Sequence, residues 1–277
     1  ILIFSNIYRV KGIDTWLYRT EIPFDLFKKP QLNLVYKIVY SSIDNLIVET
    51  NKMKSFYRTI LKPSASIYVL YSALDCSDIQ YVKKENKIPK YITFCGVISS
   101  EEKDGLLLAL EGFSNILNYY DELYFYIVGG HCNELYYQSL KKRVHNLNID
   151  NNVIFTDKVS REKYIWYLKN AFLLVNCKKP GGYNSYGLSS KVIEYLYSGN
   201  PVLLTRADEY QDLLSDTKNV IFIDYSVESF CAKVIWLLNN ESDAKKIGEQ
   251  GMIKASDLFS IEKMASTLLY CVDKKNG

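Results

Sequence analysis

Residues 180–204 read PGGYNSYGLSSKVIEYLYSGNPVLL, and this stretch decides the fold of the chain. A loop rich in Gly and Ser ends at Gly187, and the helix that follows it stops at Gly199, before an apolar strand. Free backbone N–H groups and the positive end of the helix dipole therefore face whatever lies in front of the loop. Lys191 and, one turn later, Glu194 belong to the beginning of this helix.

A cationic loop rich in N–H groups, with a carboxylate one turn behind it, suits a diphosphate joined to a ribose. The alternative is that Lys191 is one more surface lysine and Glu194 a solvated helix residue. A capping role for Glu194 does not fit, because a capping box places the acid three residues after its Ser or Thr. Ser190 precedes Glu194 by four residues. The segment therefore favours a ligand site over a plain surface helix.

Residues 94–105, FCGVISSEEKDG, form a second loop of this kind. Gly96 lets a ligand approach the backbone closely, and Lys103 lies at the start of a helix, where a phosphate is favoured. The alternative is a lysine at a helix start with no ligand. Two cationic loop–helix junctions on one sheet favour the ligand site.

Short apolar strands alternate with helices from residue 91 onward, which indicates a parallel sheet covered on both faces. Residues 32–71 show the same alternation, which indicates the latter part of a second Rossmann-like domain. The chain begins with a strand-like run at Ile1, without Met, and this predicts a fragment that has lost its natural N-terminus. The expected parts are residues 1–85 (end of a front domain, with a linker), 86–260 (a ligand-binding domain) and 261–277 (a helix packing back toward the front domain).

Both motifs resemble the nucleotide-sugar site of the retaining glycosyltransferases of family 4, which have the GT-B fold. The resemblance implies an α/β chain of two Rossmann-like domains with parallel sheets, the first of them incomplete. It implies transfer of a sugar from a nucleotide diphosphate sugar to a glycan or lipid-linked acceptor, with retention of the anomeric configuration. It further implies an enzyme of bacterial cell-envelope polysaccharide biosynthesis.

The resemblance also assigns roles to residues. Lys103, Lys191 and the N–H groups of Gly187 and Leu188 would hold the diphosphate, and Glu194 the ribose. The two lysines and Glu194 are the candidate catalytic residues. Further donor contacts are expected at Gly96, Gly129, Val159 and Ser190.

Several residues depart from the family pattern. Val97 stands where many members have an arginine that helps to hold the phosphates, and Asp157 stands where a glycine is usual. Tyr186 replaces the first of two glutamates, so the leaving phosphate itself is expected to take the acceptor proton. These departures leave open a non-catalytic nucleotide-sugar-binding or scaffold protein of the same fold. We interpret Arg161 and Tyr164 as a surface residue and a helix-packing residue.

Composition excludes several other classes of protein. The net charge of +3 is small and the basic residues are scattered, which excludes a nucleic-acid partner and is compatible with peripheral contact to the inner membrane. The chain has no G-x-G-x-x-G, no D-x-D and only two His, so we expect no nicotinamide cofactor, no metal and no sugar 2-epimerase. Six isolated cysteines indicate buried free thiols in a reducing cytoplasm.

Overall fold

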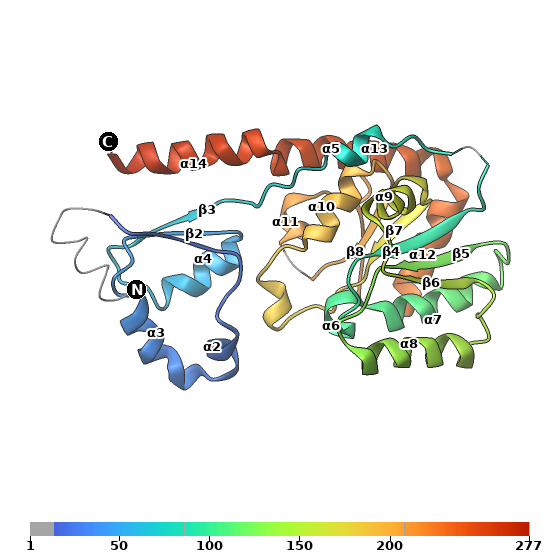
Figure 1. The fold of residues 1–277 in the computed structure, drawn as a ribbon, viewed down its shortest axis with the longest axis horizontal. Coiled ribbons are helices and arrows are strands. Elements are labelled where there is room, and N and C mark those ends of the chain that lie inside the picture. The colour runs from blue at the N-terminus through green and yellow to red at the C-terminus, as the bar shows by residue number, and fades with distance from the viewer. Residues whose placement is uncertain (1–13, 86, 208, 277) are drawn as a thin grey trace. The chain divides into compact units, whose positions relative to one another are not determined.

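The computed structural model describes residues 14–85, 87–207 and 209–276, and the chain forms two compact units (Figure 1). In the described part, the first unit comprises residues 14–73, 181–188 and 261–276. The second unit comprises residues 74–180 and 189–260. The first unit therefore ends before the predicted boundary at residue 85. The strand predicted at Ile1 lies outside the described residues.

A six-stranded parallel sheet forms the centre of the second unit, with the order β6-β5-β4-β7-β8-β9. Its strands are β4 (Tyr91–Cys95), β5 (Tyr124–Val128), β6 (Val153–Asp157), β7 (Leu173–Asn176), β8 (Val202–Thr205) and β9 (Ile221–Ile223). Every residue of β4, β7, β8 and β9 is buried, as expected of a parallel sheet covered on both faces. The chain adds β5 and β6 on one side of β4, then returns to form β7 on the other side of β4, and adds β8 and β9 beyond it. Ligands of such sheets bind where the order reverses, at the carboxyl ends of the strands.

Helices cover both faces of this sheet. They are α5 (Ser77–Tyr81), α6 (Glu101–Asp104), α7 (Leu106–Leu117), α8 (Glu134–Asn146), α9 (Arg161–Asn170), α10 (Ser190–Tyr197), α11 (Tyr210–Leu213), α12 (Val227–Asn239) and α13 (Glu241–Phe259). Figure 1 shows α7 and α8 on one side of the sheet and α9 and α10 on the other. The segment expected to be a linker contains α5, which packs against α9 and α10.

Helix α13 begins at Glu241, and the sequence pattern did not predict a helix of this length here. The glycines of this helix explain the omission, because glycine weakens a helical pattern. Gly248 is needed for close packing, since a Cβ there would lie 2.5 Å from the carbonyl oxygen of Gly199. The missing side chain lets α13 approach the end of α10, the helix that carries Lys191 and Glu194.

The first unit contains a three-stranded parallel sheet with the order β1-β2-β3. Its elements are β1 (Trp16–Arg19), α2 (Phe24–Lys28), η1 (Pro30–Leu32), α3 (Asn33–Tyr40), β2 (Asn45–Val48), α4 (Asn51–Arg58), β3 (Ser66–Val69), η2 (Tyr183–Ser185) and α14 (Ile261–Asn276). Its core includes Leu46 and Val48 of β2 and Met53 and Tyr57 of α4, all fully buried. Thr50 caps α4 by accepting the N–H of Met53, which starts the helix directly after the strand.

Candidate functional site

The site predicted in the second unit lies at the carboxyl ends of β4 to β7, where the strand order reverses. Gly96 and Gly129 end β4 and β5, both with positive φ, and a Cβ on Gly129 would lie 2.2 Å from the Gly96 oxygen. Gly129 is therefore required for the packing of two neighbouring loops. A Cβ on Gly96 would lie 3.3 Å from Cε of Lys191, so the lysine stem occupies the space that the sequence assigned to a ligand.

Lys191 lies in the first turn of α10 and forms an ion pair with a buried carboxylate. Its Nζ lies 2.8 Å from Oδ1 of Asp104, whose side chain has no solvent exposure, while that of Lys191 is 19% exposed. The other oxygen, Oδ2, accepts N–H hydrogen bonds from Ser99 (2.6 Å) and Ser100 (3.1 Å). Nζ also lies 4.4 Å from the centroid of the Phe94 ring. Asp104, which sequence reasoning did not single out, thus sets the position of the Lys191 ammonium group.

The start of α7 does not offer the anion site that the sequence suggested for this loop. The carboxylate of Glu101 accepts the N–H groups of Leu107 (2.8 Å) and Leu108 (3.3 Å), so those donors are occupied. Lys103 itself has an exposed side chain on α6. Any positive charge offered to a ligand by this loop therefore comes from the lysine and not from the helix end.

The start of α10, unlike that of α7, has no side chain among the described residues that accepts hydrogen bonds from its first backbone N–H groups. Its N-cap, Ser189, makes no side-chain capping hydrogen bond, and Ser190 at the first helical position is exposed. Uncapped N–H groups at the positive end of a helix favour an anionic ligand. Val159, where a donor contact is expected, is half-buried and lies in the segment that joins β6 to α9.

Glu194 lies one turn further along α10 and is held by two donors. The hydroxyl of Tyr164 donates to Oε2 over 2.8 Å, and Nη1 of Arg161 donates to Oε1. Each oxygen of a carboxylate can accept about two hydrogen bonds, so one acceptor position per oxygen is left. Arg161 is a surface residue as interpreted, with a side chain that is 46% exposed. The interpretation is incomplete, because Arg161 and Tyr164 also contact Glu194.

Arg161 is anchored in turn by Asp78 of α5, with Nε–Oδ2 and Nη2–Oδ1 separations of 2.8 and 3.1 Å. The hydrogen bonds with Asp78 raise the pKa of Arg161 most, and the hydrogen bond with Glu194 raises it further. One signal in the sequence could have exposed this role. Arg161 is the first residue of α9, where the helix dipole disfavours a cation, so a specific anionic partner was to be expected.

Tyr195, beside Glu194 in the motif, has a structural role. Its hydroxyl accepts the N–H of Cys95 and donates to the carbonyl oxygen of the same residue, both over 2.7 Å. It therefore ties α10 to the end of β4. The Cys95 thiol is fully buried, and burial raises its pKa to about 12.

Two of the three residues that depart from the family pattern, Asp157 and Tyr186, have structural roles, whereas Val97 is exposed. Asp157 adopts a φ of +54°, and its Oδ1 accepts the Tyr137 hydroxyl over 2.6 Å, which explains how it takes the place of a glycine. Tyr186 belongs to the first unit, as do Gly187 and Leu188. The Tyr186 carbonyl accepts the hydroxyl of Thr50 over 2.6 Å, and its ring packs edge-on against Phe56. The tyrosine in place of an acid is therefore a packing residue.

Four of the six cysteines, Cys76, Cys95, Cys177 and Cys271, are buried, whereas Cys132 is exposed and Cys231 is half-buried. All six are free thiols. Within the described ranges, no three His, Cys, Asp or Glu side chains converge to form a metal site. The described helices also include none with the length and apolar content needed to cross a membrane.

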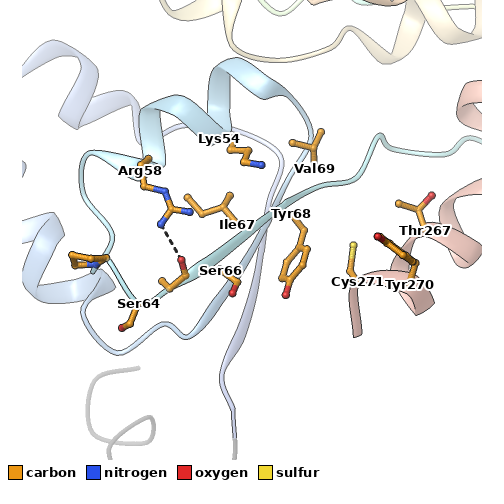
Figure 2. A pocket seen from close by; sticks show the side chains of 12 residues that line it. Lys54, Arg58, Ser64, Ser66, Ile67, Tyr68, Val69, Thr267, Tyr270 and Cys271 are labelled. Atoms are coloured by element: carbon orange, nitrogen blue, oxygen red, sulfur yellow. Dashed lines mark hydrogen bonds between the residues drawn. The ribbon is translucent and has the colours of Figure 1, made fainter. Parts of the chain in front are cut away.

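A separate hollow of about 730 Å³ lies in the first unit, lined by α4, β3 and α14 (Figure 2). Lys54 and Arg58 border it, with Tyr68, Thr267 and Tyr270. The Arg58 guanidinium donates to the carbonyl oxygen of Ala65 over 2.9 Å and thus supports the local structure. None of the predicted site residues lines this hollow.

Comparison with known proteins identifies the family. The sequence profile of the "Glycosyl transferases group 1" family matches residues 78–253, which is more than half of the chain. The chain belongs to this family. The matched region includes both of the predicted loop–helix motifs.

Two curated relatives are similar to this chain over most of its length. The alpha-1,3/1,6-mannosyltransferase ALG2 of Dictyostelium discoideum is 25% identical over 93% of this chain. An uncharacterized glycosyltransferase of Methanocaldococcus jannaschii is 24% identical over 82% of it. The chain spans 65% and 57% of the length of these relatives.

The fold is shared with solved structures. The structure of HepE from Anabaena in complex with UDP aligns with 99% of this chain, and the alignment covers 76% of HepE. The TM-score is 0.79 and the sequence identity is 10%. This likeness confirms the predicted α/β GT-B fold with parallel sheets.

Proposed function

We propose that this protein transfers a hexose from a nucleoside diphosphate sugar to a glycan or lipid-linked acceptor. The observation that carries the proposal is the pair on α10: Lys191, held by Asp104, and Glu194, held by Arg161 and Tyr164. A cation and an oriented carboxylate one turn apart suit a diphosphate and the adjoining ribose. The names of the relatives agree, since one is a mannosyltransferase and HepE was solved with UDP and with UDP-glucose.

In the proposed complex, Lys191, Lys103 and the N–H groups at Gly187 and Leu188 hold the diphosphate. These donors stabilise the charge that develops on the phosphate as the glycosidic bond breaks. Glu194 accepts ribose hydroxyls with the acceptor positions that Arg161 and Tyr164 leave. This assignment needs no metal, because side-chain cations and backbone donors supply the compensating charge.

We further propose retention of the anomeric configuration, as in family 4. The bond between the anomeric carbon and the phosphate oxygen breaks, and the acceptor oxygen bonds to that carbon on the same face. The acceptor proton passes to the released phosphate. This proton route accommodates Tyr186, which has no carboxylate to offer. A cytoplasmic place beside the membrane, in bacterial cell-envelope polysaccharide synthesis, suits such a reaction.

The test is calorimetric titration of the chain with UDP and with GDP, comparing wild type, Lys103→Ala and Lys142→Ala. Lys103 and Lys142 both have exposed side chains, but Lys142 lies on α8 and has no proposed role. A charge-assisted phosphate contact is worth about 1.5–3 kcal/mol. We therefore expect Lys103→Ala to weaken binding of the preferred nucleotide by roughly tenfold or more, and Lys142→Ala to leave it unchanged.

Absence of binding of either nucleotide to wild type, or equal affinities in all three proteins, would contradict the proposed site. For a wild type that binds, proton NMR of the glycoside formed from the matching nucleotide sugar measures the anomeric configuration. An inverted product would contradict the assignment to retaining transfer.

A further inference from the structure

Glu49 of the first unit is a buried carboxyl group that the proposed donor site does not use. It directly follows β2 and is 6% exposed. Its Oε1 accepts hydrogen bonds from the hydroxyls of Tyr18 (3.3 Å) and Ser72, and those two hydroxyls lie 2.9 Å apart. Tyr18 belongs to β1 and Ser72 follows β3, so the group joins the carboxyl ends of all three strands. Ligands of parallel sheets bind at this edge.

The hydrogen bonds of Glu49 are unevenly distributed. Both hydroxyls are directed to Oε1, and Oε2 receives a hydrogen bond from no described residue. No lysine or arginine of the described ranges forms an ion pair with it. Burial, and to a smaller extent the charge of Glu21, raises the pKa of Glu49 above its ordinary value. The described buried side-chain atoms that lack a partner do not include Oε2, so this oxygen is open to solvent and can accept a hydrogen bond from a ligand.

The surroundings of Glu49 connect it to the loop before α10. Thr50, the next residue, donates its hydroxyl to the carbonyl oxygen of Tyr186 over 2.6 Å. A Cβ on Gly187 would lie 3.9 Å from the carbonyl oxygen of Thr20, so this glycine also lies against the same sheet edge. Within the first unit, Glu49 is thus a near neighbour of the loop to which the proposed function assigns diphosphate binding.

We propose that Glu49 binds a hydroxyl group of a sugar acceptor, which donates to Oε2. This inference rests on the proposed glycosyl transfer and names the group that recognises its second substrate. A neutral polyol fits best, because the carboxylates of Glu49 and Glu21 repel anions and the cluster otherwise consists of hydroxyls. Tyr18 is 39% exposed and offers a ring face on which the C–H surface of a pyranose can pack.

The experiment uses saturation-transfer NMR with methyl α-D-mannopyranoside as the neutral probe, and calorimetry with UDP and GDP in parallel. The variants are Glu49→Gln, Glu49→Asp and, as a matched control, Glu21→Gln. Glu21 lies in the same unit, and its carboxylate accepts the Tyr183 hydroxyl over 3.0 Å. Both Glu49 variants should bind the glycoside roughly tenfold more weakly, and Glu21→Gln should change its affinity less than twofold. Nucleotide affinity should stay constant throughout.

The outcomes separate the two proposals. A wild type that binds a nucleotide but no glycoside, or Glu49 variants that bind the glycoside normally, would overturn the assignment of Glu49 and leave the donor site intact. Failure to bind either nucleotide contradicts the proposed function instead. Glu49→Asp retains the charge, so a loss of binding in this variant at unchanged melting temperature cannot be ascribed to unfolding.

Discussion

The pairing of Lys191 with Asp104 means that the lysine has both a structural and a proposed binding role. Replacing Lys191 by Met leaves the Asp104 carboxylate buried without its partner, which destabilises a protein by about 3–5 kcal/mol. The double variant Lys191→Met/Asp104→Asn removes both charges and should regain most of that stability. Urea denaturation of the two variants and wild type measures this.

Nucleotide titration of the same variants separates the two roles of Lys191. Both the single and the double variant should bind UDP or GDP more weakly than wild type, because each lacks the ammonium group. Recovery of nucleotide affinity together with stability in the double variant would show that Lys191 is only a structural residue.

The contacts from Asp78 through Arg161 to Glu194 predict how the protein distinguishes a nucleotide with ribose hydroxyls from one that lacks the 2′ and 3′ hydroxyls. If Arg161 orients Glu194, Arg161→Gln should lower the affinity for UDP or GDP but not for the corresponding 2′,3′-dideoxynucleotide. Glu194→Gln should behave in the same way, because both variants remove a contact to the hydroxyls. Equal losses for the two kinds of nucleotide would indicate an effect of Arg161 on folding or on the phosphates.

Among the secondary-structure elements, β1 and β2 are joined at their starts by Asp44. Its Oδ2 accepts the N–H (3.1 Å) and the hydroxyl (2.9 Å) of Thr15, and its Oδ1 lies 2.6 Å from Nζ of Lys62. Burial alone would raise the pKa of Asp44, but the hydrogen bonds from Lys62 and Thr15 outweigh it and lower the pKa below its ordinary value of 3.8.

Because the pKa of Asp44 is lowered in the folded protein, ionised Asp44 stabilises the fold, and the free energy of unfolding depends on pH accordingly. Because the folded state holds the ionised form, the stabilisation is present above about pH 4 and is lost as the pH falls further. Asp44→Asn should therefore lower the free energy of unfolding at pH 7 and flatten its dependence on pH between about 4 and 2. Denaturation curves across that range measure both effects, and an unaltered slope would contradict them.

The cysteine thiols of the protein differ widely in solvent exposure, so their chemical labelling can be used to follow unfolding. Cys132 is exposed, whereas Cys95 and Cys76 are buried, with thiol pKa values that burial raises to about 12. Only the thiolate reacts with alkylating reagents. Iodoacetamide should therefore modify Cys132 in the native protein and Cys95 only after unfolding. Peptide mass spectrometry after brief labelling measures the order, and early modification of Cys95 would contradict the burial of β4.

The sequence predicted the parallel sheets because their central strands are mostly apolar. It predicted Lys191 and Glu194 because both lie in one short helix. It did not predict the partners of Glu194, since Arg161 and Asp78 lie 33 and 83 residues from the groups they contact. Helix α13 was missed because its glycines, which its packing requires, weaken the helical pattern. Local patterns thus identified the elements, and only the folded chain identified the contacts between them.

The double hydrogen bond between Tyr195 and Cys95 has a consequence for the dynamics of the protein. A buried hydroxyl that bridges the end of a strand and a helix makes separation of the two costly, because both backbone groups of Cys95 would lose their partner together. Helix α10 should therefore not fray independently of β4. In hydrogen–deuterium exchange the Cys95 amide should then exchange only through large-scale opening, at a rate shared with the buried amides of α10. A nucleotide would in that case meet a binding surface that is already assembled.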